Sequence, residues 1–401
     1  MRKANLVASP APAGDASLGF TLVRGDLSFR LQRRLGLIPP EGLGLLRRAV
    51  FWSMLGWLPV ALWAWYAGRV LPGTAAEPLL AHFSIHARLL VAVPLLILAE
   101  GPANALTARL LPELVRCGIV PTEAVPRYRA ALAATARLRD ATLPWVIIVG
   151  AVVAFVTTAE TVHRAHEIDW ATADPAGVHL GFGGLWYLYV GRTIFLTLVL
   201  AWLWRVLLLT VLFWRVSRVG LVIVPTHPDR VGGLGPLEHL PTAFVPVVLA
   251  MGVALASRWA HDGVYHQVTL LSLRAEMIAF VVVCVALFVV PLLAFAGPLK
   301  RAKKQALLDY GALVGRHGRL VHERWIEGKA LADDAVLRAA ELGPVADTGA
   351  LFDSVRAMRT VPIGKATVLP IAAAAVLPIL GALAIQVPVK DLLLKLLKAL
   401  V

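Results

Sequence analysis

The sequence predicts an all-α protein, a polytopic transmembrane helical bundle of about six or seven spans with a cytoplasmic helical protrusion. Of its 401 residues, 58% are hydrophobic and only 16% are charged, whereas soluble domains carry about a quarter charged residues. The apolar residues form long unbroken blocks, and about 20 such residues in a helix cross a ~30 Å hydrocarbon core. Continuous blocks of this length exclude a transmembrane β-barrel, whose strands alternate and have about 10 residues.

Residues 1–48 are predicted to form a cytoplasmic tail with interfacial helices. Residues 1–16 are rich in Ala, Pro, Gly and Ser, a composition typical of disorder. Residues 17–47 place apolar side chains at helical spacing among arginines, which favours short helices lying on an anionic membrane surface. The polar character of this stretch argues against a signal peptide, so we expect the first span to direct its own insertion.

Residues 49–298 are predicted to form a six-helix transmembrane bundle, and residues 299–365 a cytoplasmic helical hairpin. In the hairpin, the sixth span is expected to continue into the cytoplasm and a second helix to return beside it. The predicted spans are 49–71, 87–109, 142–162, 185–214, 241–259 and 276–298.

The C-terminal part leaves two topologies open. Residues 366–387 form either a seventh span or, because of Pro370 and Pro378, a re-entrant hairpin. Residues 388–401 read as an amphipathic C-terminal helix that lies at a membrane interface.

Lys and Arg are concentrated in alternate connections, which sets the orientation. They are frequent in the N-terminal segment, in 109–139, in 215–230 and in 299–365, and rare in the connections between. By the positive-inside rule the N-terminus is cytoplasmic, in a bacterial inner membrane. The same distribution accounts for the net charge of +14 without a nucleic-acid partner. The predicted partner is the lipid bilayer, and the oligomeric state stays open.

Ionisable residues inside the predicted spans are the first functional signal: Glu100, Glu160, Arg192 and Arg205. Such residues are costly in a bilayer and face the bundle interior or a water-filled cavity. Their depths predict two ion pairs, Glu100 with Arg205 and Glu160 with Arg192. The pairs either fix helix packing or belong to an ion or proton pathway.

The second signal is the string VPTHPDRVGGLGPLE, residues 224–238, in a short predicted cytoplasmic loop. Its prolines and glycines specify turns. One interpretation is a rigid interhelical turn in which Asp229 and Arg230 pair or cap a helix. The other is a ligand or gating site where glycines let backbone N–H groups approach an anion. The candidate residues of this corner are His227, Asp229, Arg230, Gly232 and Gly233.

The strings FWRVSRVGLVIVPTHPDRVGGLG and GGLWYLYVGRTIFLTLVLAWLWR resemble a family of bacterial multi-pass integral membrane proteins whose activity is not established. The resemblance covers the second half of the chain, from residue 181 onward, and includes the leucine- and lysine-rich end after Pro388. It is specific at the PTHPDR–GGLG string and departs at Pro236, where the family pattern implies Phe. It implies a bacterial multi-pass protein and no particular activity.

Histidines gather near the predicted periplasmic ends of the spans. His82 and His86 are spaced i,i+4, and His163 lies one turn from Glu160. Three interpretations stand: a metal site, pH-dependent gating, or solvated interfacial side chains. With no HExxH-type motif, no metal site and no cofactor are predicted. The two cysteines, Cys117 and Cys284, exclude a disulfide framework.

Three functions follow as hypotheses. Passage of a small solute or ion is favoured by buried charges and by proline and glycine breaks within spans. The alternative is a membrane sensor or scaffold that signals through residues 299–365. A membrane enzyme acting on a phosphorylated lipid-linked substrate at 224–238 is the third. No catalytic constellation such as GxSxG is visible, so an enzyme is the less favoured class.

Overall fold

The computed structural model describes residues 19–71, 78–157, 170–171, 180–265, 267–329 and 343–386. Over these residues the chain is α-helical and has no β-strand. Seven helices are long and apolar enough to cross a membrane: Leu45–Tyr66, Phe83–Arg116, Thr122–Thr157, Phe182–Val216, Gly235–Tyr265, Leu270–Ile326 and Lys365–Ile385. The predicted polytopic bundle is therefore confirmed, and its environment is a lipid bilayer.

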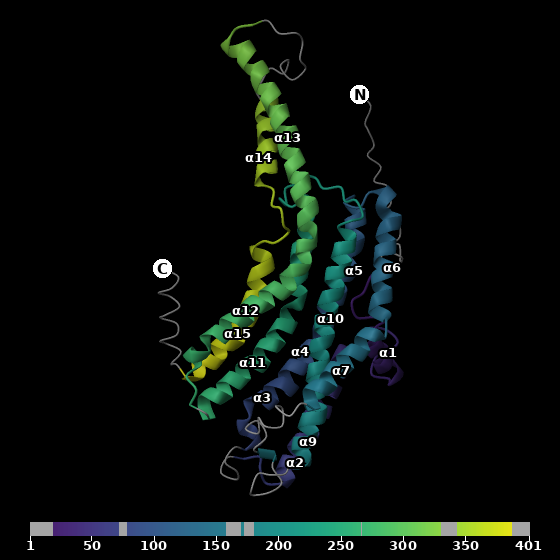
Figure 1. Cartoon of the computed structure of the whole chain (residues 1–401), viewed down its shortest axis with the longest axis vertical. Helices are drawn as coiled ribbons and strands as arrows, with labels where there is room; N and C mark the ends of the chain where they lie inside the picture. The colour runs from purple at the N-terminus through teal and green to yellow at the C-terminus, as the bar shows by residue number, and fades with distance from the viewer. Residues whose placement is uncertain are drawn as a thin grey trace, which may run out of the picture.

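Each predicted span corresponds to one of these helices (Figure 1). The regular segments of the first four are α2 (Leu45–Tyr66), α3 (Phe83–His86), α4 (Val93–Leu98), α5 (Glu100–Arg116), α6 (Val125–Asp140), α7 (Leu143–Thr157), α9 (Phe182–Trp186) and α10 (Arg192–Val216). The later ones contain α11 (Val245–Tyr265), α12 (Arg274–Val289), α13 (Ala296–Val321) and α15 (Lys365–Gln386). Helix α14 (Gly343–Ala357) lies outside the spans.

Several spans are interrupted within their length. The second changes from a π-helical segment, Ala87–Ala92, to α4, and the single residue Ala99, whose backbone stays in the right-handed helical region, separates α4 from α5. Pro102 follows and has no N–H with which to bond the preceding turn. The fourth span contains a second π-helical segment, Tyr187–Gly191. Short π-helical stretches and broken helices are frequently found at functional sites.

Part of the N-terminal segment packs into the bundle. Phe20, Leu22 and Val23 are buried in the main hydrophobic core with residues of α5, α6 and α10. One short helix, α1 (Leu27–Arg34), forms there. Leu27 and Leu31, one turn apart on α1, stay exposed, so the interfacial position of this helix stays a prediction.

The predicted hairpin projects from one end of the bundle. Helix α13 leaves the membrane segment and α14 returns along it, and together they form a rod beyond the ends of α5, α6 and α10 (Figure 1). At its base, Lys303 Nζ donates to the Arg356 carbonyl at 3.0 Å and also to the Met358 carbonyl. We call the end of the bundle that carries this rod the rod end.

Helix α15 settles the topology of residues 366–387. It is one helix of 22 residues that continues through Pro370 and Pro378, so the re-entrant hairpin is wrong and the segment is the seventh spanning helix. It packs along α11, where a side chain at Gly252 would meet Pro378 Cγ at 3.0 Å. That neighbour supports a helix whose prolines remove backbone hydrogen bonds. The predicted amphipathic helix 388–401 lies outside the described residues.

Candidate functional site

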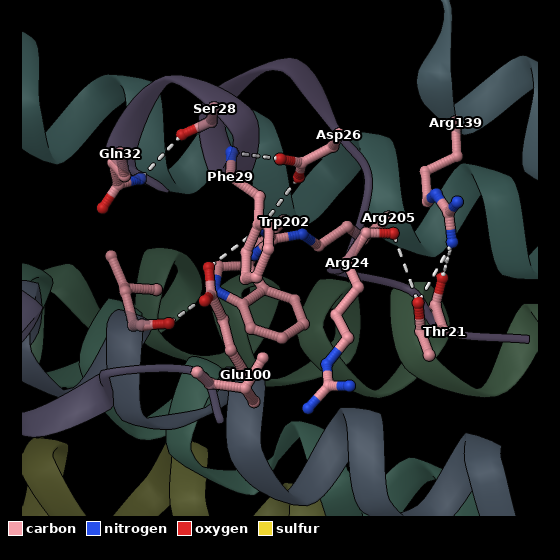
Figure 2. Close-up of polar contacts among 12 residues, drawn as sticks. Thr21, Arg24, Asp26, Ser28, Phe29, Gln32, Glu100, Arg139, Trp202 and Arg205 are labelled. Atoms are coloured by element: carbon pink, nitrogen blue, oxygen red, sulfur yellow. Dashed lines mark hydrogen bonds and ion pairs between the residues drawn. The ribbon is translucent and has the colours of Figure 1, made fainter. Parts of the chain in front are cut away.

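A cluster of buried charges lies where the second span is interrupted. Arg205 Nη2 of α10 lies 2.9 Å from Glu100 Oε1 and 3.2 Å from Asp26 Oδ2. Figure 2 shows Arg205 reaching toward both carboxylates. Arg48 Nη1 of α2 also pairs with Glu100. All four residues are at most 3% exposed, so the ion pairs are screened from water. We call Asp26, Arg48, Glu100 and Arg205 the charge cluster.

Local structure positions each carboxylate. Glu100 is the first residue of α5, two residues before Pro102 in the continuous spanning helix Phe83–Arg116. Asp26 is the N-cap of α1: its Oδ1 accepts from the Phe29 N–H at 2.6 Å, which leaves Oδ2 for Arg205. One aspartate therefore starts a helix of the N-terminal segment and binds a cation of the bundle.

Trp202 supports Arg205, and Gln32 supports Arg48. The Arg205 guanidinium carbon lies 4.8 Å from the centroid of the Trp202 ring, a cation–π contact. Gln32 Oε1 accepts from Arg48 Nε at 2.7 Å and from Trp52 Nε1 at 3.0 Å. Helix α1, which carries Gln32, thus closes the cluster on one side.

The cluster has more donors than acceptors. Two guanidinium groups face two carboxylates, so the formal charge is balanced when both acids are ionised. Arg205 Nε and Nη1, however, are buried and have no hydrogen-bond acceptor in the described part of the chain. A buried donor without an acceptor is costly, and here it belongs to a charged group.

The first predicted ion pair, Glu100 with Arg205, is confirmed. The second stays a prediction, because Glu160 lies outside the described residues. Arg192 lies with its guanidinium carbon 5.1 Å from the centroid of the Phe155 ring. Sequence reasoning missed Asp26 and Arg48, both of which lie in the segment interpreted as interfacial. An aspartate just before a helical apolar pattern is an N-cap signal that marks the start of α1.

At the corner 224–238, the Asp229 carboxylate organises the turn. Its Oδ1 accepts from the N–H groups of Val231 at 2.8 Å and Gly233 at 3.2 Å, and its Oδ2 from Gly235 N–H at 2.8 Å. A side chain at Gly235 would lie 2.9 Å from Asp229 Cβ. The geometry is that of the rigid capped turn. The N–H groups of Val231, Gly233 and Gly235 thus already bind this carboxylate.

The other residues of the corner have different surroundings. His227 Nδ1 lies 2.9 Å from Asp229 Oδ1, and the Arg230 side chain is exposed. Arg230 has φ +59° and Gly232 φ +67°, left-handed conformations that shape the turn. Partial burial acts to raise the pKa of Asp229. The backbone N–H donors and His227 outweigh burial and hold the pKa below its ordinary value.

The corner also binds the connection between the rod and α15. Arg359 N–H donates to the Arg230 carbonyl at 2.7 Å, and its guanidinium pairs with Glu238 Oε1 at 2.5 Å. The same guanidinium donates to the Ile363 carbonyl at 3.0 Å. The string singled out in the sequence is therefore the joint where the rod returns to the bundle.

Two histidines meet at the end opposite the rod. His82 and His261 are buried, and their rings stack with centroids 4.8 Å apart. The interpretation as solvated side chains is thus wrong for this pair. His86 Nδ1 accepts from Trp57 Nε1 at 2.9 Å. The residues that the structure describes contain no group of three or more His, Cys, Asp or Glu suited to a metal ion, and His163 lies outside them.

The fold and the charge cluster define the class: an α-helical multi-pass membrane protein with arginine–carboxylate pairs at an interrupted span. Comparisons with protein families, curated proteins and solved structures found no match. The resemblance at the PTHPDR–GGLG string therefore stays a prediction.

Proposed function

We propose that the protein passes a small ion across the membrane, and that the route runs past the charge cluster. The observation that supports this proposal most is the position of Glu100, a buried carboxylate two residues before Pro102 in the second span. Proline removes one backbone hydrogen bond from a spanning helix, and irregular backbone at membrane depth is tolerated where it is buried in protein or lines a water-filled cavity. Buried ionisable groups in spans mark such routes.

The donor excess favours an anion. Arg205 carries two buried nitrogens without an acceptor, Nε and Nη1, and Arg48 lies on the other side of Glu100. An anion beside Arg205 would supply the missing acceptor. A cation would face two guanidinium groups at the same place.

The N-terminal segment provides a closed state. The Asp26 carboxylate binds Arg205 and hence occupies one face of its guanidinium. Withdrawal of α1 would leave Arg48 and Arg205 with Glu100 as the one remaining carboxylate of the cluster, and so a net positive site. Asp26 then acts as a tethered carboxylate that competes with a permeating anion.

We also propose that the chain lies in a bacterial inner membrane with the rod end in the cytoplasm. The argument is the concentration of Lys and Arg in the N-terminal segment, in 109–139 and in 299–365, which by the positive-inside rule stay cytoplasmic. Labelling of single cysteines introduced at Lys304 and Glu276 in intact cells would test the orientation.

The proposal is tested by ion flux in proteoliposomes loaded with chloride, nitrate or phosphate, with potassium and protons as cation tests. We expect Asp26→Asn to raise anion flux about tenfold, since ~1.4 kcal/mol against the closed state is a factor of ten. The double variant Glu100→Gln with Arg205→Gln, which removes a balanced pair, should reduce flux to that of empty vesicles.

Arg116→Gln is the matched control, because Arg116 is an exposed cation of α5, away from the cluster. Its flux should equal that of the unaltered protein. The proposal fails when neither the unaltered protein nor Asp26→Asn passes any anion faster than empty vesicles.

A second candidate, the scaffold or sensor, is supported by the joint between rod and bundle. If a conformational change of the bundle is passed to the rod, the Arg359–Glu238 ion pair should be one of the contacts that couple the two. We expect Arg359→Gln to speed proteolysis of α14 about fivefold to tenfold, as for loss of ~1 kcal/mol of local stability. Arg356→Gln, which removes an exposed cation of α14, should leave the rate unchanged. Equal rates for both variants would contradict the coupling.

A further inference from the structure

We propose that a cavity at the rod end binds a phosphate group, carried by an anionic lipid headgroup or by a free phosphate ester. The cavity has a volume of 370 Å³ and lies between the loop after α10 and the start of α13. Its polar lining includes Ser217, Arg218 and Arg301, and its apolar lining includes Leu221 and Ile223. This site is separate from the charge cluster and does not depend on the proposed passage of ions.

Three cations from separate elements lie at or beside the cavity. Arg218 and Arg301 line it. Arg127 of α6 lies next to Gly220 of the lining, with its Nη2 3.8 Å from where a Cβ on Gly220 would stand. None of the three forms an ion pair within the residues that the structure describes. Like charges around one cavity repel, and a phosphate removes that repulsion while it accepts hydrogen bonds from guanidinium donors.

The lining is shaped for an incoming group. Gly220 of the lining has φ +97°, so a residue with a side chain would be strained there. The Arg218 guanidinium carbon lies 3.7 Å from the centroid of the Trp214 ring. This stacking holds the cation in place and reduces the entropy that it would lose on binding a ligand.

The cavity lies at the level where a lipid phosphate is found. The apolar run of α10 ends at Trp214 and Arg215, and the predicted span 276–298 ends just before Lys300 and Arg301. Tryptophans and the first basic residues after a span mark the headgroup region. Basic pockets between spanning helices at this level bind phosphate-bearing lipid headgroups, and the apolar wall offers a surface for the glycerol and acyl part.

The phosphate site proposed here is therefore the cavity beside Arg218 and Arg301, and not the glycine turn of residues 224–238. At the turn, backbone donors are taken by Asp229. In the cavity the donors are the exposed guanidinium groups of Arg218 and Arg301.

Binding is tested on the purified full chain in neutral detergent by thermal unfolding and by native mass spectrometry. Phosphatidylglycerol is expected to raise the thermal unfolding midpoint in a saturable way, because a ligand that binds the folded state stabilises that state by mass action. Phosphatidylcholine is expected to leave the midpoint unchanged. The variant Arg218→Gln with Arg301→Gln should weaken the apparent affinity at least about tenfold, or ~1.4 kcal/mol. The control, Arg316→Gln with Arg319→Gln, removes two exposed cations of α13 farther along the rod and should bind like the unaltered protein.

The source of the phosphate is decided by inorganic phosphate and glycerol phosphate. If inorganic phosphate or glycerol phosphate raises the unfolding midpoint of the unaltered protein but not that of the Arg218/Arg301 variant, the site binds a free phosphate ester. If only phosphatidylglycerol has this effect, the site binds a lipid headgroup. Equal binding of phosphatidylglycerol by the Arg218/Arg301 variant and the unaltered protein overturns the proposal, as does equal weakening in the control. The substituted arginines are exposed, so the variants are expected to fold.

Discussion

Replacing Glu100 by Gln is expected to destabilise the bundle by about 3–5 kcal/mol, because it leaves buried cations without their shared counterion. Glu100 pairs with both Arg48 and Arg205, so one neutralisation leaves the charge cluster with an uncompensated charge. The measurement is the free energy of unfolding in mixed micelles, by titration with a denaturing detergent.

Two comparisons separate this effect from a general loss of stability. Adding Arg48→Gln to Glu100→Gln restores charge balance and should recover more than half of the loss. Glu113→Gln, on the same helix, breaks an ion pair with the exposed Arg116 and should cost less than about 0.5 kcal/mol. If Glu100→Gln stays within ~1 kcal/mol of the unaltered protein, the cluster is hydrated and does not behave as buried ion pairs.

Replacing Asp229 by Ala is expected to cost about 2–4 kcal/mol and to loosen the joint of the rod, because it leaves three backbone N–H groups without their acceptor. Asp229→Asn keeps one side-chain oxygen as an acceptor, so its loss of stability should be about half that of Asp229→Ala. Unfolding of the purified chain and the rate of proteolysis of α14 both report the change.

The pH dependence has a defined sign. Because the folded-state pKa of Asp229 lies below its ordinary value, the carboxylate stabilises the fold fully above about pH 4, the ordinary range of an aspartate. This contribution is lost as pH falls through the lowered pKa. The difference between the unaltered protein and Asp229→Asn should be constant at neutral pH and shrink in acid. Asp353→Ala, an exposed acid of α14, should change stability by less than about 0.5 kcal/mol. A difference that grows in acid would contradict this account.

The sequence by itself determined the membrane architecture. Each predicted span is found as a helix, and the hairpin of 299–365 is found as α13 and α14. Hydropathy works this well because transfer of a segment into lipid depends on its own composition and length, which are local. The Glu100–Arg205 pair could also be predicted from the sequence, because the depth of a residue along a straight helix follows from its number.

Only the tertiary structure decided which groups complete the charge cluster and where the N-terminal segment lies. Asp26 and Arg48 meet Arg205 and Glu100 across long stretches of chain, and such contacts depend on how helices are rotated and packed. The apolar spacing of 17–47 predicts an amphipathic helix equally well for a lipid surface and for a protein groove. The sequence thus indicates that apolar residues must be covered, and only packing shows which of them protein covers: Phe20, Leu22 and Val23 are buried in the core, whereas Leu27 and Leu31 of α1 are not. The sequence does not distinguish the two cases, because lipid and protein both remove apolar surface from water.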